Sequence, residues 1–249
     1  AVLYSKKVGM IPIDKKAEKF KQTNEIKIAA PLLDAISIEG KNITADALLT
    51  QRRFAAYLVK KRNAHYFFTV KLNHPTLKED IEFYFDNIHR IADFTDRSEG
   101  HGRSETRRIW TTPDLNEYLN FPHVEQSFKI ERKFINKKTG KVSEETVYGI
   151  TSRSEDEVDA EKILQIVRGH WSIENSCHYI LDWNYDEDRC RIKTGNGPEN
   201  MTCLRRLAIS IIKSKNVSSV AQKMRQLSFN TRAVLDYLKI TKNTCLNRF

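Results

Sequence analysis

Four polar side chains that could carry chemistry recur at four-residue steps in the C-terminal half of the chain. They are His170, Glu174, His178 and Asp182, within a pattern that predicts one long helix over residues 156–182. Because a four-residue step turns an α-helix by only about 40°, these side chains should form one polar ridge. A carboxylate on a rigid helix, beside histidine and tryptophan, is a typical support for a metal-bound active site. The alternative is a surface helix whose charged face is solvated.

A second carboxylate, Asp46, stands where a short predicted strand over residues 41–48 runs into a predicted helix over residues 50–62. The edge of an α/β sheet, where strands end, is where functional sites gather. Two carboxylates from distant segments suit hard divalent ions such as Mg²⁺, which prefer carboxylate and phosphate oxygens and can assist phosphoryl transfer. An ordinary helix-capping aspartate is the alternative interpretation of Asp46.

Zinc is the competing metal, because the ridge contains two histidines. They are eight residues apart with Glu174 between them, which differs from the H-E-x-x-H arrangement and argues against zinc. The four cysteines form no C-x-x-C pair, and we interpret them as reduced thiols in the cytoplasm. The sequence has no P-loop, G-x-G-x-x-G or G-x-S-x-G motif, which argues against an NTPase, a dinucleotide enzyme or an α/β-hydrolase.

Positive charge is concentrated in the last quarter of the chain. The 249 residues have a net charge of +10, and residues 189–249 contain 13 Lys or Arg against two acidic residues, so the first 188 residues sum to −1. This distribution is typical of a protein that binds a polyanion such as nucleic acid, although a basic face that serves solubility would look the same. Two local clusters suit contacts with phosphates: Arg103, Arg107 and Arg108, and Arg189, Arg191 and Lys193.

The elements that must position these side chains alternate between strand and helix in the first part of the chain. The strand patterns cover residues 41–48 and 64–71, and the helical patterns cover residues 50–62 and 76–88. This order predicts an α/β fold with a mixed or parallel sheet and flanking helices. A β-rich insertion should precede the long helix, because a period of two recurs over residues 104–112, 126–135 and 145–151.

We therefore divide the chain into four parts. They are a core over residues 1–92, the insertion over residues 93–153, the glutamate helix with its return to the core over residues 154–213, and a basic helical tail over residues 214–249. In the predicted helix over residues 199–213, the side chains expected to face the core are Met201, Leu204, Leu207, Ala208 and Ile211. Arg205 and Arg206 should point elsewhere. No stretch is apolar enough to span a membrane.

Three stretches, in the right order, resemble blocks of one protein family. They read ITADALLTQRRFAAYLVKKRNAHYFFTVKLNHPTL, HGRSETRRIW and HWSIENSCHYILDWNYDEDRCRIKTGNGPEN. They are similar to the second-aspartate block, the segment after it and the C-terminal signature of insertion-sequence DDE transposases of the H-repeat-associated (ISAs-type) group. The resemblance implies an RNase H-like fold with a β-rich insertion before the glutamate helix.

The resemblance also implies a function. Members of this group cleave DNA and transfer strands at insertion-sequence ends, using Mg²⁺ or Mn²⁺ held by Asp, Asp and Glu. By motif position, Asp46 would be the second aspartate and Glu174 the glutamate, so both would bind the metal. The signature block further implies DNA contacts by Arg168, His170, Trp171 and His178. Double-stranded DNA would be the partner, a homodimer is the family expectation, and the location would be cytoplasmic and nucleoid-associated.

Two departures from the family pattern affect these expectations. Val167, His170 and Leu181 hold positions at which broader relatives carry a Tyr, an Arg and a Lys. The first aspartate should lie on an opening strand followed by Gly-Lys, and no Asp-Gly-Lys occurs. Asp14 does not match, and Glu39-Gly40-Lys41 directly precedes the second-aspartate block.

We therefore expect the opening strand to precede Ala1, so that this is an N-terminally truncated transposase or a decayed copy. With two of three metal carboxylates, it is predicted not to cut DNA. The alternatives are a non-catalytic DNA-binding remnant and an RNase H-like nuclease unrelated to transposition.

Overall fold

The computed structural model describes residues 2–5, 9–12, 25–100, 102–173, 179–215 and 217–240. The chain divides into two compact units, which we call the sheet unit, residues 15–170, and the helical unit, residues 1–14 together with residues 171–249. The predicted insertion lies within the sheet unit, and the basic C-terminal part lies within the helical unit. No helix in the described ranges is long and apolar enough to cross a membrane.

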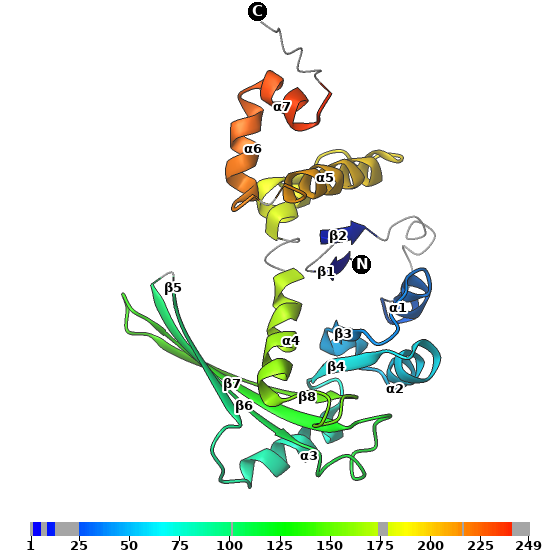
Figure 1. Cartoon of the computed structure of the whole chain (residues 1–249), viewed down its shortest axis with the longest axis vertical. Coiled ribbons are helices and arrows are strands. Elements are labelled where there is room, and N and C mark those ends of the chain that lie inside the picture. Colours follow the sequence, from blue (N-terminus) through cyan, green and yellow to red (C-terminus); the bar gives the residue numbers. More distant parts are fainter. Residues whose placement is uncertain are drawn as a thin grey trace, which may run out of the picture. The chain divides into compact units, whose positions relative to one another are not determined.

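Six strands form one mixed sheet in the sheet unit, in the order β3-β4-β8-β7-β6-β5 (Figure 1). β3 and β4 are parallel, and every other neighbouring pair is antiparallel. The predicted α/β fold with a mixed sheet is therefore confirmed, and it is consistent with the RNase H-like class. The strands are β3 Asn42–Ala45, β4 His65–Val70, β5 Phe94–Gly100, β6 Arg103–Thr112, β7 Gln126–Asn136 and β8 Val142–Thr151.

The β-rich insertion consists of four strands, one more than the sequence pattern predicts. The sequence of β5, FTDRSEG, is polar and charged, so it lacks the apolar alternation that marks its neighbours. The insertion continues the core sheet, because β8 pairs with β4 and places Ile150 opposite Phe68. Gly149 permits this close approach: a Cβ there would overlap the Phe128 ring and lie 2.6 Å from the Phe68 carbonyl oxygen.

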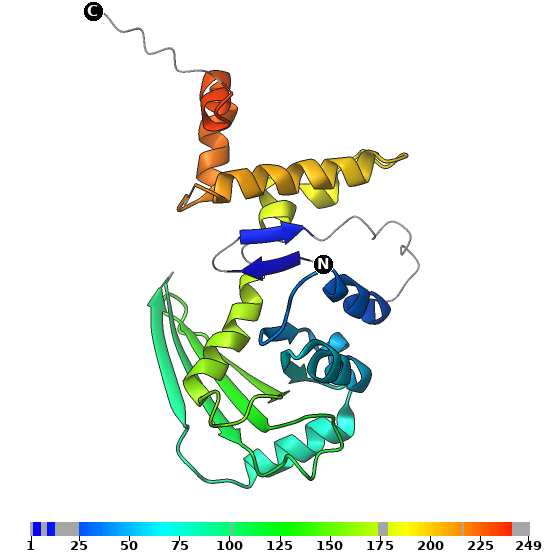
Figure 2. The same ribbon diagram turned by 45° about the vertical axis from the view of Figure 1, so that its right-hand side comes forward.

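The two faces of the sheet bury separate hydrophobic cores, because successive strand side chains point to opposite faces. Tyr66 and Phe68 belong to the core shared with α1 (Glu25–Asp34), α2 (Arg52–Ala56) and α3 (Pro75–Asp86). Phe67 belongs to the core shared with α4 (Ala160–Ile173), around which the long strands of the insertion curve (Figure 2). The helix that should carry the glutamate therefore packs on the face opposite α3.

Helix α4 begins later than the sequence pattern predicts. It begins at Ala160, so residues 156–159 precede it. The Asp159 carboxylate accepts a hydrogen bond from the Lys162 N–H at 2.8 Å and so caps the start of the helix. The range predicted as one helix, residues 156–182, also falls in both units. Leu164 packs in the sheet unit, whereas Leu181 lies on the π-helical turn Ile180–Asn184 and packs in the helical unit.

The described part of the helical unit includes the antiparallel hairpin of β1 (Val2–Ser5) and β2 (Gly9–Pro12) and the α-helices α5 (Gly197–Lys213), α6 (Val220–Ser228) and α7 (Thr231–Tyr237). Asn230 caps α7 by accepting a hydrogen bond from the Ala233 N–H at 3.0 Å. A small core forms from Ile180, Leu181, Ile209, Ile212 and Val220.

The predicted inner face of α5 is wrong. Leu204 and Leu207 are more than half exposed, and Ile209 and Ile212 are buried instead. Arg205, expected to point away, is only 11% exposed and lies 3.7 Å from Glu187. The apolar residues of this helix extend beyond the predicted stripe to Ile209 and Ile212, and these two define the buried side, while the acidic partner decides where the arginine lies.

Candidate active site

Asp46 lies at the carboxyl end of β3, in the segment of residues 46–50 that we call the Asp46 turn. Its Oδ1 accepts a hydrogen bond from the Ala47 N–H at 2.7 Å and so caps the 3₁₀ turn Ala47–Leu49. The side chain is 70% exposed, and Oδ2 has no hydrogen bond within the described residues. The capping interpretation therefore holds for one oxygen, while the second is available to a ligand.

Lys71 is a functional candidate that the sequence analysis does not identify. It directly follows β4, the parallel neighbour of β3, and its Nζ lies 3.7 Å from Asp46 Oδ1. Parallel strands present their carboxyl ends at one edge of the sheet, where ligands bind in open α/β folds. The signal that could have identified Lys71 is its position immediately after the apolar run of β4.

Helix α4 reaches the same edge strand through His170. The His170 Nδ1 lies 3.2 Å from the Thr44 hydroxyl oxygen, and Thr44 precedes Asp46 by two residues. The helix predicted to carry the glutamate therefore contacts the strand that leads to Asp46. Glu174, His178 and the side chain of Trp171 lie outside the described residues.

Two arginines predicted to contact DNA are joined to one carboxylate of β5. Asp96 Oδ2 accepts hydrogen bonds from Arg107 Nη1 at 3.1 Å and from Arg168 Nη1 at 2.8 Å. Arg107 also pairs with Glu105, and its side chain is only 11% exposed. The strand register explains the first pair, because Asp96 lies directly opposite Arg107. Both guanidinium groups therefore already have a carboxylate partner within the sheet unit.

The other arginines of the first predicted cluster are exposed on β6. The Arg103 guanidinium lies 5.8 Å from the centre of the Phe134 ring, an arrangement that favours a cation–π contact. Arg108 is also exposed. The sequence places Arg103, Arg107 and Arg108 in one cluster, but the sheet gives Arg107 a different environment from its neighbours.

The second predicted cluster lies in the helical unit, between the π-helical turn and α5. Arg189, Arg191 and Lys193 are all exposed. Arg189 is 83% exposed and forms a long ion pair of 3.6 Å with Asp186. Such exposed pairs contribute little energy, so these cations are free to approach phosphates.

A divalent metal is compatible with the part of the donor set that the structure describes. Asp46 offers an exposed carboxylate with one oxygen free of hydrogen bonds, which suits a hard cation. Within the described ranges, no group of three or more His, Cys, Asp or Glu gathers in a metal-binding arrangement. Asp182, the last member of the predicted ridge, is exposed in the helical unit.

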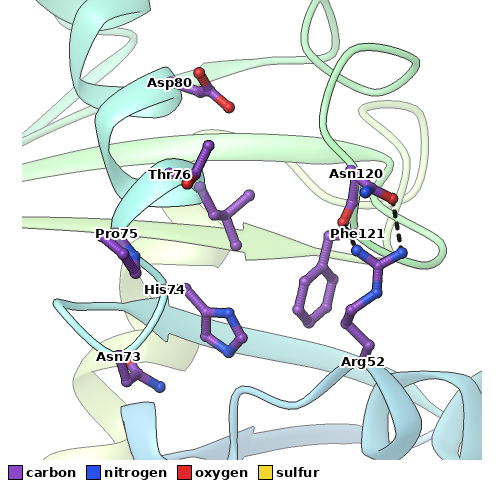
Figure 3. Close-up of a pocket in the computed structure, with 9 residues that line it drawn as sticks. Arg52, Asn73, His74, Pro75, Thr76, Asp80, Asn120 and Phe121 are labelled. Carbon is purple, nitrogen blue, oxygen red and sulfur yellow. Dashed lines mark hydrogen bonds between the residues drawn. The ribbon is translucent and has the colours of Figure 1, made fainter.

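A pocket of about 300 Å³ adjoins the Asp46 turn, between the starts of α2 and α3 (Figure 3). Its walls are formed by residues 73–77 together with Arg52, Asp80, Asn120 and Phe121. Arg52 is held at the rim, because its guanidinium donates to the backbone oxygen of Asn120 and, at 2.7 Å, to the Asn120 side chain. This pocket is not predicted from the sequence, because its residues come from three separate segments.

Comparison with known proteins identifies a family. The family model described as Transposase DDE domain matches residues 2–211. The chain is 30% identical over 242 residues to "H repeat-associated putative transposase YhhI" of Escherichia coli K12, a match that covers 92% of this chain and 61% of that protein. It is 28% identical over 222 residues to "Putative transposase YncI" of Escherichia coli O157:H7, which covers 84% of this chain and 56% of that protein. The chain thus spans about three fifths of the length of these relatives.

One solved structure aligns along most of the chain with low similarity. It is a cryo-EM structure of a piggyBac transposase synaptic complex with hairpin DNA, and the alignment covers 96% of this chain and 46% of that one. The TM-score is 0.39 and the sequence identity is 14%. These values are too low to support a statement about fold or function, and the family match stands without them.

Proposed function

We propose, on the premise that this chain belongs to the transposase DDE domain family, that it forms the catalytic core of an enzyme that cleaves insertion-sequence ends and joins them to target DNA. The observation that carries this proposal is the position of Asp46 at the carboxyl end of β3, the strand that pairs in parallel with β4 and that α4 contacts through His170. The exposed cations of the helical unit add a surface suited to the DNA backbone.

Asp46 and Glu174 would hold Mg²⁺ or Mn²⁺ in this proposal. When bound, such an ion activates the attacking oxygen and stabilises the leaving one. Asp46 presents an exposed carboxylate, and Lys71 places a positive charge beside it, where a phosphate of the cleaved strand would lie. Arg189, Arg191 and Lys193 would hold the DNA backbone without reading its sequence. After cleavage, the freed 3′-hydroxyl would attack the target strand.

We also propose that these 249 residues, tested alone, bind DNA without cutting it. The sequence contains no Asp-Gly-Lys, so only two of the three carboxylates expected for the metal site are present. Two carboxylates bring less negative charge and fewer ligands to the ions that the reaction requires. The chain should then act as a DNA-binding competitor at insertion-sequence ends.

The test combines a nicking assay with a binding assay. A supercoiled plasmid incubated with the purified chain and Mg²⁺ or Mn²⁺ should remain uncut, whereas a short duplex should bind with an affinity that falls steeply with salt. A metal-dependent nick that Glu174→Ala abolishes would overturn the proposed inactivity. Cleavage without strand joining would favour a nuclease, and DNA binding that is absent even at low salt would contradict the proposed function.

A further inference from the structure

We infer that Asn73 and His74 are positioning residues for Asp46, because their side chains hold the turn that carries this carboxylate. The inference rests on the proposed function, since it takes Asp46 as a metal ligand. Asn73 and His74 lie in the loop between β4 and α3, 27 and 28 residues beyond Asp46 in the sequence. Neither of them is assigned a role by the motifs that identify the family.

Burial does not fix the Asp46 carboxylate, because this side chain is 70% exposed, although Ala47 and Thr50 in the same turn are buried. Within the turn, the Asp46 carbonyl accepts a hydrogen bond from the Leu49 N–H at 2.9 Å, and the Ala47 carbonyl accepts one from the Thr50 N–H at 3.0 Å. These bonds form one short 3₁₀ turn, a type of helix with poorer hydrogen-bond geometry than an α-helix. Because the Asp46 side chain is mostly exposed, its position depends on how firmly this turn is held.

The loop after β4 holds the turn at two carbonyl groups. The Asn73 Nδ2 donates to the Ala47 carbonyl oxygen at 2.6 Å, one residue after Asp46. The His74 Nε2 donates to the Thr50 carbonyl oxygen at the other end of the turn. The Thr50 hydroxyl, fully buried, donates in turn to the Thr69 carbonyl oxygen at 2.8 Å on β4. Both ends of the turn are therefore attached to one neighbouring strand and its loop.

The His74 side chain is itself fixed by packing. The His74 ring packs edge-on against Phe121, with ring centroids 6.0 Å apart at an interplanar angle of 89°, and both rings line the pocket beside the turn (Figure 3). Phe121 is buried and contacts Tyr66. Burial raises the pKa of Tyr66, so its phenol stays protonated and donates to the Pro122 carbonyl oxygen at 2.7 Å. The ring that orients His74 therefore belongs to the core.

This arrangement supplies what an exposed metal ligand needs. A metal-binding carboxylate must be held close to its productive position by groups that are themselves fixed. Loss of such supporting partners in metal sites typically lowers metal affinity by about 10–100-fold. Asn73 and His74 therefore act on the proposed metal through the backbone of the turn, without touching the ion.

The experiment compares variants that separate the hydrogen bond from the packing. His74→Phe keeps an aromatic ring against Phe121 and removes the N–H donor, whereas His74→Gln keeps a donor of similar reach. Asn73→Ala removes the second contact. Asn87→Ala is the matched control. The Asn87 Nδ2 also donates to a backbone carbonyl, that of Phe83 at 2.7 Å, and Asn87 lies at the C-terminal end of α3, the helix that follows His74.

Two readouts are needed. Mn²⁺ affinity, measured on the full chain by the EPR signal of the free ion, should fall roughly tenfold in His74→Phe and Asn73→Ala and recover in His74→Gln. Amide hydrogen exchange at residues 47–50 should accelerate in the same two variants, with exchange in α4 unchanged. Asn87→Ala should leave both readouts at their wild-type values.

The possible failures can be told apart. If wild-type Mn²⁺ binding does not depend on Asp46, as judged by Asp46→Asn, the proposed metal role fails and the inference falls with it. If the wild type binds through Asp46 but His74→Phe and Asn73→Ala bind equally well, only the inference is overturned. A global loss of stability in both variants, with no recovery in His74→Gln, would also overturn it, because the side chains would then be merely structural.

Discussion

The strands of the insertion and the loop before α5 both carry basic residues, but their charges have different surroundings. On the sheet, Arg107 is nearly buried between Asp96 and Glu105, and Arg168 shares the same aspartate. In the helical unit, Arg189, Arg191 and Lys193 are exposed. A count of basic residues treats the two regions alike, whereas the structure separates cations that hold the fold from cations that a polyanion can reach.

The difference follows from strand pairing. Antiparallel neighbours bring opposite charges face to face, so an arginine inside a sheet can satisfy its donors with carboxylates of the next strand. On the other side, Arg132 of β7 lies directly opposite Arg107, and Glu105 of β6 pairs with both arginines. A loop has no such fixed neighbours, and its cations keep their hydration and counterions until a ligand displaces them.

The largest expected effect is on stability, from Arg107→Leu. Removal of this guanidinium breaks its ion pairs with Asp96 and Glu105 in a partly buried site and leaves each carboxylate one other cation, Arg168 or Arg132. The free energy of unfolding should therefore fall by about 2 kcal/mol. Urea denaturation measures the change. Arg108→Leu, an exposed neighbour on the same strand, is the control and should change stability by less than about 0.5 kcal/mol. Equal losses in the two variants would remove the distinction between paired and exposed arginines.

The next effect is on DNA binding, from the combined variant Arg189→Ala, Arg191→Ala and Lys193→Ala. If each cation contacts one phosphate, the slope of log affinity against log salt should decrease in magnitude by about 2.7, and affinity should fall at least about tenfold. Stability should not change. Fluorescence anisotropy with a labelled duplex at several salt concentrations measures both quantities.

The matched control for that variant removes the same charge from the sheet unit. Lys137, Lys138 and Lys141 are exposed at the turn between β7 and β8. Their replacement by alanine should change the salt slope much less than the combined replacement of Arg189, Arg191 and Lys193 does. If both triple variants lose affinity equally, net charge alone accounts for binding, and the loop has no special role.

The smallest effect concerns Arg168, which is intermediate between the paired arginines of the sheet and the exposed cations of the loop. Its side chain is 47% exposed, so its ion pair with Asp96 should contribute only about 0.5 kcal/mol to stability. A double-mutant cycle of Arg168→Ala with Asp96→Asn measures that coupling. If Arg168→Ala lowers DNA affinity while the coupling energy is near zero, Arg168 acts as a DNA contact, as the signature block implies, and the pair with Asp96 is secondary.

The sequence by itself determined most elements of the sheet unit and the location of Asp46 at the end of a strand. Apolar residues at helical spacing mark α3, whose Leu77, Ile81 and Phe85 are buried. The aromatic and β-branched run of β4 marks a buried strand. These predictions succeed because local periodicity records which side of an element is buried, and burial of apolar area is the main driving force of folding. The ordered motifs then identify the family.

Only the tertiary structure decided which partner each polar side chain has. The polar strand β5 supplies the carboxylate that pairs with Arg107 and Arg168, and no apolar alternation marks it. Lys71, Asn73 and His74 reach the Asp46 turn because β3 and β4 are parallel neighbours. Such contacts depend on strand order, register and distances of a few ångströms between residues far apart in the chain. Hydrophobic periodicity carries no information about them, so the sequence shows which residues are polar and the fold decides what they bind.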